Sequence, residues 1–371
     1  MIESIAARSL EIPFKTTFSH ASASRDTTHS LWVEVRMRDG TAGFGEGCPR
    51  DYVTGETLEG ALAFVSGFTA IWLKDIRDIV SLTAWTRTHR AEIDANPAAW
   101  CAVELALLDA FSKQAGQTIE ALLGLPPIAG RFRYTAVLGD SAAKRFEAEL
   151  SRYRQAGFRD FKIKLSGNLQ RDLDKVALLK AGGIAPESVR ADANNLWTDA
   201  GEAIRFLSSL DYGFVALEEP LRSGDHVGMN RVAAQTGCSI ILDESLLRAD
   251  QLSLFSDSPM RWIVNLRISK MGGLIRSVEL LDHVRRSGLR VIIGAHVGET
   301  SLLTRAALTI ANAARDILVA QEGAFGTHLL EHDVVNPPIM FGPGGMLDAS
   351  QLAVGTGFGL IPQHYDGRWQ Q

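Results

Sequence analysis

Two lysines and three carboxylates recur through the middle of this 371-residue sequence at nearly equal intervals. Lys164, Asp192, Glu218, Asp243 and Lys270 each stand at or near the end of a short apolar run, about 28, 26, 25 and 27 residues apart in turn. That spacing is close to the length of one strand–loop–helix–loop unit. Ionisable residues at the same end of successive parallel strands are typical of a barrel active site. The pattern therefore predicts a single site to which several units contribute.

The order of these residues predicts their arrangement around a bound ligand. Adjacent strands of an eight-stranded barrel differ by about 45° around its axis, so the second and sixth strands face each other. We expect Lys164 and Lys270 to approach the ligand from opposite sides. Asp192, Glu218 and Asp243 would line the arc between them. Three carboxylates without a nearby His or Cys form a hard oxygen site, which suits Mg²⁺, or Mn²⁺, better than Zn²⁺.

The two parts of this arrangement suit one reaction. A divalent ion that binds a substrate carboxylate stabilises the enolate formed when the α-proton is removed, and a lysine can remove that proton. Lys162 lies two residues before Lys164, so both side chains are expected on the same face of the strand. Its positive charge favours the neutral form of Lys164, which is the form that acts as a base.

The surrounding sequence alternates between strand-like and helix-like segments. Helical spacing is clear at 142–156, 169–181 and 200–210. Eight βα units and the absence of a Gly-x-Gly-x-x-Gly fingerprint predict an α/β protein with a (β/α)8-type (modified TIM) barrel. The eight expected strands are 134–138, 161–165, 189–194, 215–220, 240–244, 263–270, 290–296 and 317–322.

The residues before the barrel have a different pattern. Alternating polarity predicts antiparallel strands with a hairpin turn at Arg38–Gly40, and polar segments predict loops at 14–30 and 45–56. The period becomes helical from Thr57 to Leu123. We therefore expect three parts, namely an α+β domain over 1–130, the barrel over 131–336 and a C-terminal segment over 337–371 that returns to the first domain.

Bulk composition narrows the class of protein. The net charge is −5 and the pI is near 6.0, so no basic surplus suggests nucleic acid as a partner. No apolar run is long enough to span a membrane, and the N-terminus lacks the pattern of a secretory signal. Cys48, Cys101 and Cys238 are unevenly spaced and odd in number, which argues against a disulfide framework. We expect a cytoplasmic homo-oligomer whose partner is a small-molecule carboxylate.

Five motifs of the predicted barrel resemble those of the enolase superfamily, muconate-lactonizing enzyme subgroup. They are Phe161-Lys162-Ile163-Lys164-Leu165, Arg190-Ala191-Asp192-Ala193-Asn194, Leu217-Glu218-Glu219-Pro220, Leu242-Asp243-Glu244-Ser245 and Ile268-Ser269-Lys270-Met271-Gly272-Gly273. The resemblance implies that Asp192, Glu218 and Asp243 bind one Mg²⁺ and that Lys164 and Lys270 are the acid/base pair. It also implies that residues 1–130 form the capping domain of the family, whose loops 14–30 and 45–56 select the substrate.

Two neighbouring glutamates compete for one ligand position. Successive residues of a strand face opposite ways, so Glu218 and Glu219 cannot both point into the barrel. The family pattern, commonly Glu-Gln-Pro, favours Glu218. By the same alternation we expect Glu244 to lie behind the site.

The subgroup includes cycloisomerases, o-succinylbenzoate synthases, dipeptide epimerases and amino-acid racemases, so membership alone leaves the reaction open. Lysines on both faces permit a two-base transfer of the α-proton. The stretch 52–56 is similar to a capping-domain loop of dipeptide epimerases, which favours a racemase or epimerase and makes Tyr52 and Thr54 candidate substrate contacts. Asn194 is a further candidate. A cycloisomerase, a dehydratase-like lyase and a non-catalytic binding protein are the alternatives.

Two departures from dipeptide epimerases concern the last strands. Those enzymes carry an Asp-x-Asp pair at the eighth strand for the substrate ammonium, whereas this sequence has Ala320-Gln321-Glu322. Either Glu322 replaces the pair or the substrate lacks an ammonium group. After the seventh strand, His296 and Glu299 stand where the subgroup usually has Met-Leu-Glu. We expect His296, Glu299 and Glu322 to contact the substrate.

Overall fold

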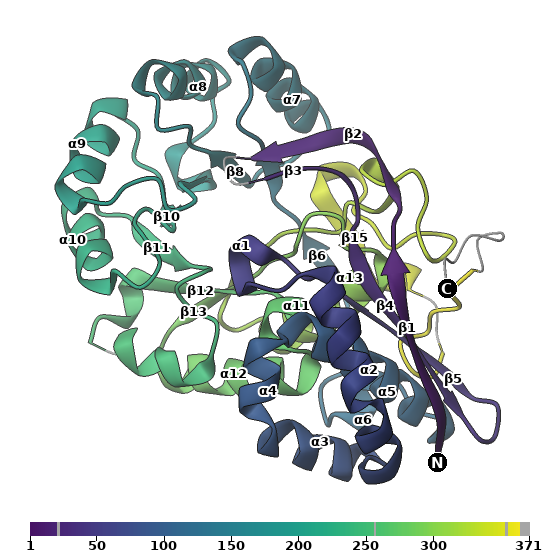
Figure 1. The fold of residues 1–371 in the computed structure, drawn as a ribbon. Helices are drawn as coiled ribbons and strands as arrows, with labels where there is room; N and C mark the ends of the chain where they lie inside the picture. Colours follow the sequence, from purple (N-terminus) through teal and green to yellow (C-terminus); the bar gives the residue numbers. More distant parts are fainter. Residues whose placement is uncertain (21–22, 256, 353–354, 364–371) are drawn as a thin grey trace.

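The computed structural model describes residues 1–20, 23–255, 257–352 and 355–363 (Figure 1). It begins with a three-stranded antiparallel sheet in the order β1-β4-β5. The strands are β1 (Ile2–Leu10), β4 (Ser30–Met37) and β5 (Ala42–Gly47). The predicted turn at Arg38–Gly40 is confirmed, because it joins β4 to its antiparallel partner β5 and Gly40 has a φ of 87°. Only glycine adopts such a φ without steric cost.

The segment expected as a loop at 14–30 is largely a β-hairpin instead. Its strands β2 (Pro13–His20) and β3 (Ala23–Thr27) pair antiparallel. The polar composition suggested a loop, but Thr is enriched in strands, and the backbone of this segment is paired. Residues 21–22 of the expected loop lie outside the described residues. The second expected loop, 45–56, is also partly regular. Its first residues are the end of β5, and residues Asp51–Thr54 form the single helical turn α1.

Helices cover one face of the first sheet. One of them, α5, packs on β5, where glycine stands at every second position. A Cβ added to Gly43, Gly45 or Gly47 would come within 1.9 to 2.1 Å of a carbonyl oxygen of α5. These glycines therefore allow the helix to lie directly on the strand. The helices are α2 (Leu58–Asp75), α3 (Ile79–Thr88), α4 (Arg90–Ala95), α5 (Pro97–Gln114) and α6 (Ile119–Leu122).

Eight parallel strands form the second sheet, in sequence order from β7 to β14. The backbone N–H of Thr135 donates to Gln321 O at 2.8 Å, which links the two ends of the curled sheet. The strands are β7 (Ala136–Leu138), β8 (Phe161–Lys164), β9 (Val189–Asp192), β10 (Ala216–Glu218), β11 (Ser239–Leu242), β12 (Trp262–Leu266), β13 (Arg290–Ile293) and β14 (Leu318–Gln321).

Helices follow the first seven of these strands and surround the sheet (Figure 1). They are α7 (Ala143–Gln155), α8 (Leu169–Ala181), α9 (Ala200–Leu210), α10 (His226–Thr236), the 3₁₀ segment η2 (Ala249–Phe255), α11 (Ile268–Met271) with α12 (Leu274–Arg286), and α13 (Ser301–Ala313). The expected eighth βα unit is incomplete, since the helical segments in the described residues after β14 are all short 3₁₀ turns. Pro337, Pro338, Pro343 and the glycines 342, 344 and 345 explain the absence of a helix there.

The C-terminal segment contacts earlier parts of the chain. Its strand β15 (Met346–Asp348) pairs antiparallel with β6 (Arg131–Arg133). Further on, Phe358 N donates to Asp109 Oδ1 at 3.0 Å, and Ile119 N donates to Gly357 O at 3.1 Å. The segment therefore bonds to the helices α5 and α6 of the N-terminal part.

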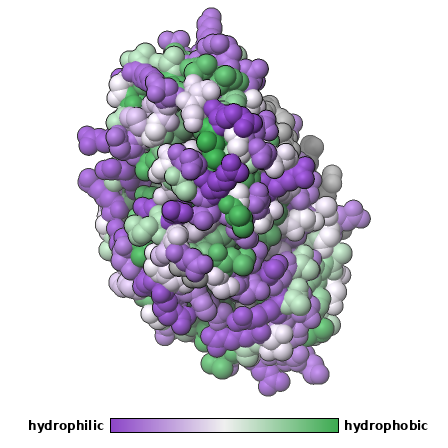
Figure 2. Space-filling view, turned by 90° about the vertical axis from the view of Figure 1, so that its left-hand side faces the viewer, coloured by the Kyte–Doolittle hydropathy of each residue, from purple (hydrophilic) through white to green (hydrophobic). Residues whose placement is uncertain are grey.

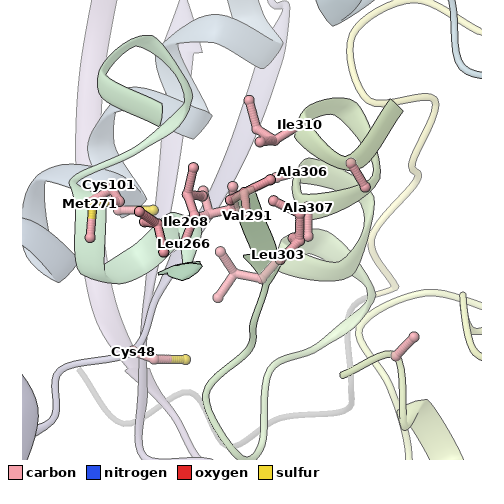
Figure 3. Packing of buried hydrophobic residues seen from close by; sticks show 14 of the residues in the cluster. Cys48, Cys101, Leu266, Ile268, Met271, Val291, Leu303, Ala306, Ala307 and Ile310 are labelled. Atoms are coloured by element: carbon pink, nitrogen blue, oxygen red, sulfur yellow. The ribbon is translucent and has the colours of Figure 1, made fainter. Parts of the chain in front are cut away.

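Buried apolar side chains join the N-terminal part to the barrel. Figure 3 shows Cys101 near Leu266, Ile268 and Met271, with side chains of α13 on the other side of Val291 and Cys48 apart from this group. All of these residues belong to one core cluster. The three cysteines are buried and free.

Hydrophilic side chains cover most of the molecular face that carries α9 and α10, with apolar ones scattered among them (Figure 2). Val227 on α10 is an exposed apolar residue, with 85% of its surface accessible. Isolated exposed apolar residues are ordinary on a soluble surface. No helix among the described residues is long and apolar enough to cross a membrane.

One buried carboxyl group fastens β5 to the barrel and gives a pH-dependent prediction. Glu46 is fully buried, and it accepts hydrogen bonds from Thr300 Oγ1 at 2.5 Å and from Thr300 N at 3.2 Å. Burial raises the pKa of Glu46 from 4.5 to about 8. Unfolding therefore releases a proton between these two values, so Glu46 makes the free energy of unfolding fall as pH rises from about 5 to 8.

Glu46→Gln should remove this pH dependence. Relative to the original protein, the variant is expected to gain about 2 kcal/mol of unfolding free energy between pH 6 and pH 8. Urea unfolding of both proteins at the two pH values measures the difference. The exposed Glu11→Gln is the control, since its effect should be the same at both pH values. An equal effect of Glu46→Gln at pH 6 and pH 8 would contradict the prediction.

Candidate active site

The three predicted carboxylates lie side by side at the carboxyl ends of neighbouring strands. Asp192 ends β9 and is paired in register with Glu218, which ends β10. Asp243 follows the last residue of β11. All three are buried, with at most 2% of each residue exposed. Parallel pairing brings them together because equal ends of parallel strands share one edge of the sheet.

The two lysines of β8 contact this group, and each has different partners. Lys162 Nζ lies 2.6 Å from Glu218 Oε2, 2.9 Å from Glu322 Oε2 and 3.3 Å from Asp192 Oδ2. Lys164 Nζ donates to Asp192 Oδ2 at 2.5 Å and to Asn194 Oδ1 at 2.9 Å. Burial alone would lower the pKa of Lys162, but the surrounding carboxylates outweigh it and raise this pKa above its ordinary value. Lys162 is therefore a permanent cation beside Lys164.

Lys270 contacts Asp243, at another part of the site. Its Nζ donates to Asp243 Oδ1 at 2.8 Å, to Asp243 O at 2.8 Å and to Asn265 O at 2.7 Å. The sequence predicted Lys270 at the end of a strand, but β12 ends at Leu266 and Lys270 lies on the single helical turn α11. Gly272 and Gly273, with φ of 80° and 100°, end that turn.

A second cation of this strand end was not predicted from the sequence. Arg267 forms an ion pair with Asp243, and its Nη2 lies 3.6 Å from Glu218 Oε1. Asn265 Nδ2 donates to the same Glu218 oxygen at 3.1 Å. Alternation along β12 was the available signal, because Asn265 and Arg267 are two residues apart, like Lys162 and Lys164. With Lys162 and Lys270, Arg267 balances the three carboxylates.

Glu219 has a different role from its neighbour Glu218. Its φ of 37° turns the chain, and its carboxylate accepts hydrogen bonds from Asp243 N at 2.7 Å, Ser245 N at 2.8 Å and Ser245 Oγ at 2.7 Å. These bonds hold the 243–245 turn, which carries Asp243. Glu219 therefore positions Asp243 and lies outside the carboxylate trio.

The pocket beside these residues has a volume of about 100 Å³. Glu322 lies on its wall, but Lys162 already binds one of its oxygens, and the other, 4.0 Å from Arg190 Nη2, accepts no hydrogen bond from a described residue. Asn194 also lines the pocket. The expectation that Glu244 lies behind the site is wrong, because Glu244 lines the pocket too, and burial raises its pKa well above the ordinary value. The lining consists of Tyr52, Val137, Lys162, Lys164, Asn194, Asp243, Glu244, Arg267, Ala295, His296, Val297, Glu322, Gly323, Phe325 and Leu329.

His296 is on the pocket wall, and Glu299 is behind it. Neither ring nitrogen of His296 has a hydrogen-bond partner among the described residues, although Nδ1 lies 3.7 Å from Glu299 Oε1. Burial, followed by the charges of Arg267 and Arg50, lowers the pKa of His296, so its ring is neutral. Glu299 accepts a hydrogen bond from His296 N at 2.7 Å, and burial raises its pKa to about 7. Of these two predicted substrate contacts, only His296 lines the pocket.

Tyr52 and Thr54, predicted as substrate contacts, are also separated. Tyr52 of α1 lines the pocket, and the Arg25 guanidinium lies 5.8 Å from its ring centre. Thr54 Oγ1 instead donates to Glu56 Oε2 at 2.8 Å and is not part of the pocket lining. Tyr52 can therefore contact a ligand in the pocket, whereas Thr54 stabilises the helical turn α1 that carries Tyr52.

The donor chemistry of the trio fits a hard divalent cation. Asp192, Glu218 and Asp243 provide carboxylate oxygens only, and all three are buried beside basic side chains. A different group of possible ligands, Cys48, His296 and Glu299, has donor atoms within 4.8 Å of one another. The positive charges of Arg50 and Arg267 act on His296 and disfavour a cation there. Mg²⁺ or Mn²⁺ at the trio is the combination that the residues support.

Removing the acceptor that positions Asp243 should weaken such a site. Glu219→Ala deletes three hydrogen bonds to the 243–245 turn, so the affinity for Mg²⁺ is expected to fall by about 10- to 100-fold. Glu219→Gln keeps one amide oxygen as acceptor and should lose less than Glu219→Ala. Calorimetric titration with Mg²⁺ measures both. Equal affinity of Glu219→Ala and the original protein would exclude this positioning role.

Comparison with known proteins gives matches along nearly the whole chain. The family described as Enolase C-terminal domain-like matches residues 145–363. The hydrophobic dipeptide epimerase of Enterococcus faecalis is 27% identical over 340 residues, which cover 88% of this chain and 91% of that protein. N-succinyl-L-Arg/Lys racemase of Bacillus cereus is 23% identical over 323 residues, or 84% of each chain. A solved dipeptide epimerase from Enterococcus faecalis, complexed with Mg and the dipeptide L-Leu-L-Tyr, has a TM-score of 0.81 at 24% identity and covers 97% of this chain and 99% of that one.

Proposed function

This chain belongs to the enolase C-terminal domain-like family, and from that premise we propose that it is a metal-dependent racemase or epimerase of amino-acid-like or dipeptide carboxylates. Two relatives that match most of the chain are a dipeptide epimerase and an N-succinyl amino-acid racemase. The observation that carries the proposal is the presence of two lysines bound to different members of one carboxylate trio. Lys164 contacts Asp192, and Lys270 contacts Asp243.

Asp192, Glu218 and Asp243 are the proposed ligands of one Mg²⁺, which Mn²⁺ could replace. When bound, the ion neutralises negative charge that develops on the substrate carboxylate after loss of the α-proton. The solved Enterococcus faecalis epimerase with Mg and a dipeptide, which shares the fold, supports this choice of metal.

The lysines move the proton. Lys164 removes the α-proton from one face of the substrate, and Lys270 supplies a proton to the other face; in the reverse direction they exchange roles. Lys162 remains charged because three carboxylates surround it and raise its pKa. The buried position of Lys270, 1% exposed, excludes water from its partner atoms.

Substrate selection belongs to residues around the pocket mouth. Tyr52 of the 45–56 segment and His296 after β13 line the pocket, and His296 offers a neutral ring with two nitrogens that no described residue binds. The hairpin within 14–30 contributes Arg25, which lies next to Tyr52. Glu322 contributes one carboxylate oxygen that can accept a hydrogen bond from an amide or ammonium of the substrate.

Isotope exchange tests the proposal. The protein is incubated in D₂O with Mg²⁺ and a set of L-dipeptides, N-acyl amino acids and amino-acid betaines, and deuterium at Cα is measured by NMR. The expected result is exchange together with appearance of the epimer for at least one class. No exchange with any of these carboxylates would contradict the proposal, and conversion without exchange at Cα would favour a cycloisomerase or lyase.

A further inference from the structure

A second and larger cavity adjoins the active-site pocket. Its volume is about 730 Å³, compared with about 100 Å³ for the pocket itself. Both are lined by Val137, Phe325 and Leu329, so these three side chains stand between the two spaces. Small-molecule sites usually have several hundred Å³, so the pocket alone holds little more than the reacting end of a substrate.

The cavity lies where an eighth barrel helix would otherwise pack. One side is α7, and the other is the irregular chain after β14, between Phe325 and Pro343. Strand β2 reaches the same place in Figure 1, and its Thr16 lines the cavity. The backbone of β2 is held there, because Lys15 N donates to Leu329 O at 2.8 Å.

Aromatic rings form a wall of this cavity. Phe341 is at the centre, with Phe158 at 5.3 Å and Phe325 at 5.4 Å between ring centres, both edge-on, and the His328 ring stacked at 4.7 Å. Tyr153 of α7 packs edge-on against Phe158 at 4.9 Å. Such a wall favours an apolar or aromatic ligand.

The charged groups that line the cavity have partners within the described part of the chain. Arg145 binds Glu149 at 3.1 Å on α7, and Asp140 binds Lys175 at 2.8 Å. Arg152 lies over the Tyr153 ring at 5.2 Å. Ser141 Oγ is buried and has no hydrogen-bond partner among the described residues. It is therefore available to form a hydrogen bond with a neutral polar group of a ligand.

We propose that this cavity binds the distal part of the substrate, which is a bulky apolar or aromatic acyl group or side chain on the nitrogen side of the reacting amino acid. The inference rests on the proposed function for the identity of the reacting end. The substrate carboxylate and Cα occupy the pocket near Lys164. The distal group of the substrate extends past Val137, Phe325 and Leu329 into the cavity. The substrate class is therefore N-acyl amino acids or dipeptides with a long apolar distal group, since the carboxylates of the cavity lining, Asp140 and Glu149, already have cationic partners.

A series of ligands and two matched variants test this assignment. Binding of N-acetyl-, N-hexanoyl- and N-(4-phenylbutanoyl)-L-leucine is measured by calorimetry in the presence of Mg²⁺. Burial of each methylene strengthens binding by up to about fourfold, so the two long ligands are expected to bind at least tenfold more tightly than the acetyl compound. Ser141→Trp fills the cavity and should abolish that gain while leaving the acetyl affinity within about twofold. Lys144→Trp, an exposed position of α7 outside the cavity lining, is the control and should keep the gain.

The outcomes separate this inference from the proposed function, because α-deuterium exchange is followed in the same samples. Affinity that does not depend on acyl length, or a length gain that Ser141→Trp leaves unchanged, overturns the cavity assignment even if exchange occurs. A length gain that Ser141→Trp abolishes supports the assignment, and if exchange is then absent the proposed reaction alone is wrong. Failure of both long ligands to bind overturns the assignment.

Discussion

Lys270→Ala is expected to lower epimerisation by about a thousandfold, and Lys164→Ala by a similar factor. Each lysine is the acid/base on one face of the substrate, so inversion needs both. Each variant should nevertheless keep α-deuterium exchange for one enantiomer, because the remaining lysine still removes and returns the proton on its own face. The two variants should therefore retain exchange of opposite enantiomers, which NMR with the separate L- and D-compounds would reveal.

The loss of the Lys270 positive charge and any loss of protein stability must be distinguished from the loss of its acid/base function. Lys270 binds Asp243 through Nζ at 2.8 Å, and its loss leaves a buried carboxylate with fewer partners. Lys270→Arg retains a positive charge, but a guanidinium does not act as a base near neutral pH. It should fold and bind Mg²⁺ yet lose inversion as Lys270→Ala does. Full inversion in either variant would exclude Lys270 as the second base.

The interval between charged residues predicted the carboxylate trio because strand pairing obeys simple register rules. Asp192 and Glu218 are direct partners in neighbouring parallel strands, so equal spacing in the sequence became adjacency in space. The alternation of strand residues also placed Glu218 and Glu219 on different sides, and the structure shows their separate partners. Strand spacing and side-chain alternation are local properties, so they can be predicted from a single sequence.

Features that depend on packing were not predictable in the same way. Lys270 was expected on a strand because apolar residues continue past Leu266. The glycines at 272 and 273 instead permit a helical turn, from which Lys270 reaches Asp243. Any side chain at position 273 is excluded by the packing, since a Cβ on Gly273 would lie 2.3 Å from Glu104 Oε1. The balance of Lys162, Arg267 and Lys270 against three carboxylates likewise requires knowledge of several strands at once.

Glu218→Gln is expected to reduce Mg²⁺ affinity by at least about 100-fold and epimerisation by a comparable factor. The substitution keeps the size of the side chain and an amide oxygen that can accept from Asn265 Nδ2, but it removes one of the three negative charges of the site. Lys162, which lies 2.6 Å from Glu218 Oε2, then has only Glu322 and Asp192 as carboxylate partners within the described part of the chain. A metal cation would therefore be attracted by one carboxylate fewer, while the positive side chains that repel it are unchanged.

The neighbouring carboxylate gives the matched control for this prediction. Glu219→Gln makes the same chemical change one residue away, but Glu219 bonds to the 243–245 turn and has no cation among its described partners. Calorimetric titration with Mg²⁺ should therefore show a much larger loss for Glu218→Gln than for Glu219→Gln. Unchanged affinity in Glu218→Gln, or a larger loss in Glu219→Gln, would remove Glu218 from the metal site. Because the two residues differ in partners and hardly in burial, the comparison tests which carboxylate faces the ion and is insensitive to the general cost of altering a buried charge.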